Sequence, residues 1–117
     1  MRMLALLALA LAGAAPLAHA QPAADADPSV DIARTAADTA EERLVDLRRA
    51  VWSRLDQAQR AAFAERERAW LNVGRAEEQK QCQGLSPTPL VVQQCRLLVA
   101  ERRLSVLAPD LRANITR

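Results

Sequence analysis

The sequence predicts an all-α fold, a small three-helix bundle in which a helical hairpin packs against a third helix. Apolar residues recur at helical spacing in three segments, and no segment shows the apolar and polar alternation of a strand. A capping-box sequence and a stretch rich in Gly and Pro separate the three segments. With 117 residues, the chain has room for one small domain.

The first 20 residues have the composition of a secretory signal peptide. Arg2 supplies the positive charge, residues 4–12 form the apolar run, and residues 18–20 (Ala-His-Ala) form a small-residue cleavage motif. The apolar run is too short to cross roughly 30 Å of hydrocarbon. We therefore expect cleavage after Ala20, no membrane insertion afterwards, and a periplasmic or secreted protein. Residues 21–37 are then expected to form a leader that is disordered or loosely helical.

The helical domain is expected over residues 38–108, and its first helix has one apolar face. The residues of this face fall at i, i+3, i+7, i+8 and i+11: Leu44, Leu47, Val51, Trp52 and Leu55. Charged residues occupy the opposite face. Asp56 followed by Gln59 has capping-box spacing, which predicts a new helix start or a tight turn.

The second helix is expected over residues 58–81 on a narrow apolar stripe that includes Phe63 and Trp70. Trp70 is interpreted as a core residue because Phe63 lies one heptad earlier, and Trp52 is interpreted in the same way. Gly74 costs about 1 kcal/mol relative to Ala inside a helix. It marks either a close-packing point or a place where the helix bends or frays.

A break at residues 84–89, which contains Pro87 and Pro89, separates the second helix from the third. The third helix starts near Leu90 and carries Leu and Val over more than half of its circumference. Pro109 is expected to end it, because proline lacks the N–H that a helix interior requires. Residues 109–117 would then form a C-terminal tail.

The two cysteines, Cys82 and Cys95, are expected to form a disulfide, because the signal peptide directs the chain to an oxidising compartment. Such a bridge would contribute about 3 kcal/mol of stability. Redox motifs usually place their cysteines two residues apart, and this pair is much further apart. Two cysteines without a histidine cannot complete a structural zinc site. We expect no metal and no cofactor.

Composition also argues against catalysis and nucleic-acid binding. The single histidine, His19, lies in the segment expected to be removed, so the mature chain lacks the base of Ser-His-Asp and Cys-His catalysis. Removal of Arg2 leaves 16 − 1 = 15 basic residues against 14 acidic ones, a net charge of +1. That charge is too small to steer the chain to nucleic acid or to an anionic membrane. We expect a protein that is not an enzyme.

One sequence pattern resembles a known family. The pattern consists of Arg66-Glu67-Arg68-Ala69-Trp70-Leu71, Arg75, Cys82, a Pro/Gly loop, Cys95, and Arg102 ahead of the closing leucines. It resembles the lysozyme-inhibitor LprI-type family of small secreted helical proteins over about residues 41–107, with family-motif positions at Arg68, Trp70, Arg75 and Arg102. The chain departs from the family in three ways: Glu67 replaces a Gln, Cys82 lies about one helical turn later, and a further cysteine pair is absent.

The resemblance implies a secreted binding protein that inhibits lysozyme. Lysozymes are generally cationic, so an inhibitor is expected to be acidic or to insert a basic or hydroxyl side chain into the cleft. Ser86 and Thr88, in the loop between the cysteines, are the candidates for such insertion. The alternative is an envelope structural or assembly protein that associates through its helix faces and has no inhibitor activity.

Four arginines, Arg68, Arg75, Arg102 and Arg103, would form an anion-binding cluster if their helices packed together. The competing interpretation is a solvated face with scattered ion pairs, because exposed charged residues are usually solvated and contribute little when they pair. Between the two interpretations the sequence favours the solvated face.

Overall fold

The computed structural model describes residues 27–115, and the side chains of residues 27–112. These residues form α3 (Pro28–Trp52), α4 (Gln57–Ala69), the π-helical turn η2 (Trp70–Gly74), α5 (Arg75–Gln83) and α6 (Pro89–Ile115). Because α4, η2 and α5 are continuous, the described chain is a bundle of three helices, and the predicted fold class is confirmed. The expected signal peptide and residues 21–26 of the leader lie outside the described residues.

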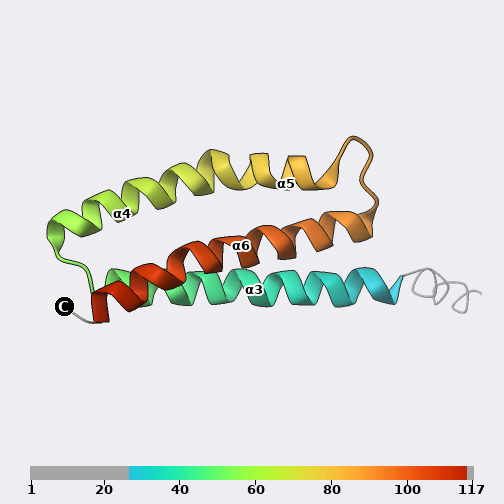
Figure 1. Cartoon of the computed structure of the whole chain (residues 1–117). Coiled ribbons are helices and arrows are strands. Elements are labelled where there is room, and N and C mark those ends of the chain that lie inside the picture. Colours follow the sequence, from blue (N-terminus) through green and yellow to red (C-terminus); the bar gives the residue numbers. More distant parts are fainter. Residues whose placement is uncertain (1–26, 116–117) are drawn as a thin grey trace, which may run out of the picture.

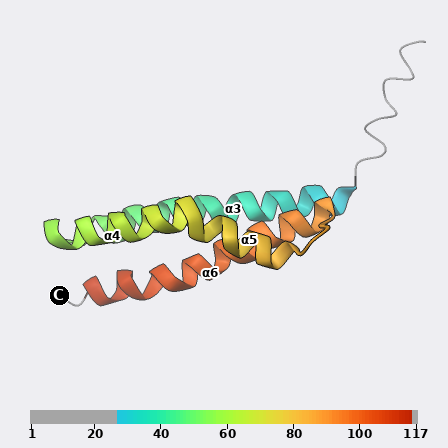
Figure 2. The same cartoon turned by 90° about the horizontal axis from the view of Figure 1, so that it is seen from above.

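The chain runs along the bundle three times (Figure 1). α3 and α6 run in the same direction and are the most closely packed pair of helices, whereas α4 to α5 runs back in the opposite direction. Seen from above, α4 lies over α3, and α5 lies over the first half of α6 (Figure 2). The hairpin is therefore formed by α5 and α6, and α3 lies against α6. Among residues 27–115, no helix combines the length and the hydropathy needed to span a bilayer.

The first helix begins earlier than the sequence pattern predicts, at residue 28 instead of residue 38. Asp27 caps it by accepting a hydrogen bond from the Ser29 N–H at 2.9 Å, and Pro28 occupies the first helical position. Of the two alternatives expected for the leader, residues 28–37 agree with the helical one and not with disorder, and they form regular helix. The residues that this segment buries against the bundle include Ala37, whose small side chain carries little hydropathy signal.

The second helix begins where the sequence predicts. The Asp56 carboxylate accepts from the Gln59 N–H at 2.8 Å, and the Gln59 side chain accepts from the Asp56 N–H at 3.0 Å. These two bonds complete the predicted capping box and satisfy two backbone N–H groups at the helix end.

The apolar core follows the seam between α3 and α6 and is closed by two aromatic residues of the second helix. Its members are Ala40, Leu44, Val51, Phe63, Trp70, Val99, Ala100 and Leu107. Trp70 lies in the core as predicted, but Trp52 does not, because 42% of it is exposed. Trp52 is the last residue of α3, where its ring lies 6.4 Å from that of Phe63 and carries Arg60 on its face. It therefore covers the edge of the core.

The third helix continues past Pro109 to Ile115, so the prediction that Pro109 ends it is wrong. Proline removes one helical hydrogen bond. Two contacts of the next turn offset that loss: Leu111 packs against the core, and Asp110 accepts a hydrogen bond from Arg66 of α4 at 2.6 Å. Of the expected tail, residues 116 and 117 lie outside the described residues.

Candidate functional site

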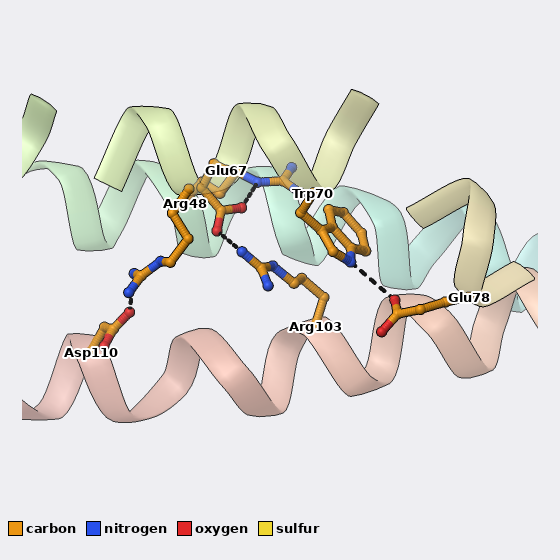
Figure 3. A network of polar contacts seen from close by, with 7 residues as sticks. Arg48, Glu67, Trp70, Glu78, Arg103 and Asp110 are labelled. Atoms are coloured by element: carbon orange, nitrogen blue, oxygen red, sulfur yellow. Dashed lines mark hydrogen bonds and ion pairs between the residues drawn. The ribbon is translucent and has the colours of Figure 1, made fainter. Parts of the chain in front are cut away.

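Glu67 is the one buried charged residue of the part of the chain that the structure describes, at 5% exposure. It points from α4 toward the space between α3 and α6 (Figure 3). Its Oε2 accepts from Arg48 Nε at 2.8 Å, and its Oε1 accepts from Arg103 Nη2. One carboxylate therefore joins all three helices through charge-assisted hydrogen bonds.

Trp70 lies beside this ion-pair network and is surrounded by guanidinium groups. The Arg103, Arg48 and Arg75 guanidinium carbons lie 5.0, 5.5 and 5.9 Å from the centre of its ring. Guanidinium groups are attracted to the negative face of an aromatic ring. The indole Nε1 donates to Glu78 at 3.0 Å (Figure 3). Trp70 is thus held both by the core and by polar contacts from α3, α5 and α6.

The π-helical turn η2 explains how Trp70 reaches Glu78. Residues eight apart on a regular α-helix point about 80° away from each other. The wider turn at Trp70–Gly74 accommodates about one additional residue, which brings Glu78 onto the face of Trp70. The indole also lies across Gly74, where a Cβ atom would be 2.9 Å from Trp70 Cδ1. Gly74 is therefore a close-packing point within an irregular turn.

A second group of ion pairs joins α3 to α6. Arg96 donates to Asp38 at 2.7 Å and to Glu41 at 3.0 Å. These bonds raise the pKa of Arg96 above its ordinary value: the hydrogen bond with Asp38 is the largest cause, and partial burial acts in the opposite direction. A raised pKa means that this stabilisation is complete below the ordinary arginine pKa and is lost only as pH rises through the folded value. Arg96 therefore stays charged throughout the physiological range.

The structure separates the predicted motif positions. Trp70 and Arg75 belong to the site around the indole ring, whereas Arg68 and Arg102 are exposed. The four arginines considered above therefore do not form one cluster. The interpretation as a solvated face holds for Arg68 and Arg102, but it is wrong for Arg103, which is paired with Glu67 and only 11% exposed.

The disulfide between Cys82 and Cys95 is present, with an S–S distance of 2.07 Å and a Cα–Cα distance of 5.7 Å. It ties the end of α5 to the second turn of α6 on either side of an exposed loop. In this loop Gly84 has a φ of 75°, which favours glycine, and Leu85 is fully exposed. Of the two predicted loop residues, Thr88 uses its hydroxyl to accept from the Val91 N–H at 3.2 Å, and Ser86 is exposed.

The sequence does not reveal the central role of Glu67, because its partners Arg48 and Arg103 are 19 and 36 residues away. One signal was available: Glu67 lies four residues after Phe63 and three before Trp70, so it is a charge inside an apolar stripe. Side chains that could hold a metal are not grouped either. Within the described residues, no three His, Cys, Asp or Glu side chains lie where they could share an ion.

Comparisons with known proteins find no relative of this chain. No family model, no curated protein and no solved structure matches this chain.

Proposed function

We propose that the chain is a periplasmic or secreted binding protein without enzymatic activity, which docks a partner protein through the loop between Cys82 and Cys95. The observation that carries this proposal is the full exposure of Leu85 in that loop. A large apolar side chain gains free energy when a partner covers it. Loops held on a rigid scaffold carry binding residues disproportionately often.

The loop is held in place before any partner arrives. The disulfide fixes the ends of the two helices that flank it, and Pro87 and Pro89 restrict its backbone. Fixing a loop in advance lowers the conformational entropy that binding would otherwise cost. Leu85 also lines an open groove of about 560 Å³ together with Glu77 and Lys80 of α5, which adds charged groups around the apolar contact.

A lysozyme is the first partner to test, because of the resemblance carried by Trp70, Arg75 and the two cysteines. Under this proposal Leu85 and Ser86 enter the cleft of the enzyme, Leu85 supplying apolar contact and Ser86 a hydroxyl group. Thr88 takes no direct part, since its hydroxyl caps α6. The expected signal peptide and the disulfide agree with a compartment in which such a partner is found.

The test is a titration of the mature chain, residues 21–117, against lysozyme, with binding heat and enzyme activity measured together. Leu85→Ala is expected to weaken binding about tenfold. Ile32→Ala is the matched control, since Ile32 is also an exposed apolar residue, at 71%, but stands on α3. If neither binding heat nor inhibition is observed at tens of micromolar, roughly the range of weak complexes, lysozyme is excluded as the partner. If the two variants weaken binding equally, the loop is excluded as the binding site.

An envelope assembly role is the second candidate, and apolar side chains exposed on the helices favour it. Val45 on α3 is 43% exposed, and Val106 on α6 is 51% exposed. Such residues can contribute to contacts between helix faces. Sizing of the mature chain by light scattering tests this role: a defined oligomer supports it, and a monomer that recruits no protein from an envelope extract contradicts it.

A further inference from the structure

A cavity of about 220 Å³ lies beside Trp70, between α3, the η2 to α5 segment and α6. Part of its lining is apolar and comes from Leu44, Val99 and the Trp70 ring. Three guanidinium groups complete it, those of Arg48, Arg75 and Arg96. Apolar walls with a few convergent polar groups are typical of small-molecule sites.

Two of these arginines have donor groups to spare. Arg48 uses its Nε for Glu67, while its Nη2 is buried and has no hydrogen-bond partner in the structure. Buried polar groups in folded proteins nearly always have a partner, so this nitrogen is a candidate for ligand binding. Arg75 stacks on Trp70 and pairs with no carboxylate among the described side chains.

The charges that line the cavity leave one arginine available to an anion. One carboxylate lines it, that of Glu41, and this group is already paired with Arg96 at 2.8 Å. Arg48 is likewise paired with Glu67 at 2.8 Å, so Arg75 is the one lining arginine without a carboxylate partner among the described side chains. Three further acids lie nearby and are already engaged: Asp38 pairs with Arg96 at 2.7 Å, Glu67 binds Arg48 and Arg103, and Glu78 accepts from the Trp70 indole.

We propose that this cavity binds a small carboxylate that carries an apolar body. The carboxylate is held by Arg48 and Arg75, because guanidinium and carboxylate groups form paired hydrogen bonds. The apolar body lies against Trp70 and Leu44. A cavity of about 150 Å³ is sufficient for benzene, so one of about 220 Å³ accommodates a molecule the size of benzoate. The π-helical turn supports the proposal, since such turns are frequent at functional sites.

This site is separate from the loop between the cysteines, so it does not depend on the docking proposal. The probe is benzoate, titrated into the isotope-labelled mature chain while the two indole N–H signals are followed by NMR. We expect a saturable shift of the Trp70 signal and little change at Trp52, which is exposed and does not line the cavity. Benzamide, which has the same shape without the charge, is expected to bind about tenfold more weakly.

Two arginine variants test whether benzoate binds in this cavity. Arg75→Gln is expected to weaken benzoate binding about fivefold. The Arg75 side chain is exposed, so this variant is expected to keep the fold, and its thermal unfolding verifies this. Arg68→Gln, an exposed arginine that does not line the cavity, is expected to leave binding unchanged. A shift that does not saturate, equal binding of benzamide, or equal effects of the two variants would each overturn the proposal.

Discussion

Glu67 holds three helices together from a buried position, and its charge can be removed with almost no change in size. Glu67→Gln leaves the guanidinium groups of Arg48 and Arg103 facing a neutral amide, although these side chains are only 19% and 11% exposed. Removing one member of a buried ion pair is strongly destabilising. We expect the free energy of unfolding to fall by about 3 kcal/mol, measured by urea denaturation.

The control for this prediction is Glu65→Gln on the same helix, because Glu65 is exposed. Its effect is expected to stay within about 0.5 kcal/mol. Equal losses in the two variants would show that the buried ion pairs contribute no more than a surface charge.

Gly74 is a second position where a single atom has a large effect. On helix propensity alone, Gly74→Ala should stabilise the protein by about 1 kcal/mol. The new Cβ would lie 2.9 Å from Trp70 Cδ1, however, and that ring atom belongs to a buried side chain. We expect a net loss of about 1 kcal/mol, because overpacking outweighs propensity. Thermal unfolding measures it, with a gain of a few tenths of a kcal/mol expected for the exposed control Asn72→Ala.

The hairpin of α5 and α6 depends on its disulfide more than on apolar contact, since α5 contributes no buried residue. Replacing both cysteines by alanine is expected to lower the free energy of unfolding by about 3 kcal/mol. Urea denaturation with and without reductant measures this loss. Reductant should destabilise the native chain by a similar amount and leave the double variant unchanged. If reductant has no effect on the native chain, the bridge does not stabilise the fold.

At the scale of the helices, the local capping signal at Asp56 predicts a helix start correctly, whereas the local signal at Pro109 is overridden by packing that the sequence does not display. The start of α4 was predicted because Asp56 and Gln59 satisfy each other within one turn. The start of α3 is placed too late because its start signal, Asp27 followed by Pro28, lies in a stretch without apolar periodicity, and because Ala37 gives little hydropathy contrast. The end of α6 was misplaced because Pro109 carries a local cost, and the packing of Leu111 that offsets it depends on the whole fold.

Across the whole molecule, the three helices contribute unequally to the core. α3 and α6 supply all members of the apolar core cluster except Phe63 and Trp70. We therefore expect the amides of α4 and α5 to exchange with solvent at a lower opening free energy than the central amides of α3 and α6. Native-state hydrogen exchange measures this difference. Equal protection of all three helices would contradict it and would indicate a single cooperative unit.

The candidate site was predicted in part. Trp70 and the two cysteines follow from helical spacing and from the expected compartment, which are properties that a sequence displays directly. The network around Glu67 does not follow, because it brings together three helices whose relative positions depend on packing. Arg68 and Arg75 both lie near Trp70 in the sequence, but Arg68 is two residues before it and points to the other side of the helix, whereas Arg75 lies at the Trp70 ring.

The different burial of the two tryptophans has a spectroscopic consequence. Trp52 is 42% exposed, whereas Trp70 is 8% exposed beneath its guanidinium groups. The chain has no tyrosine, so its near-ultraviolet fluorescence comes mainly from these two indoles. Iodide in the solvent should quench the long-wavelength emission of Trp52 and leave the shorter-wavelength emission of Trp70. The protein therefore carries one built-in optical reporter of its surface and another of its interior.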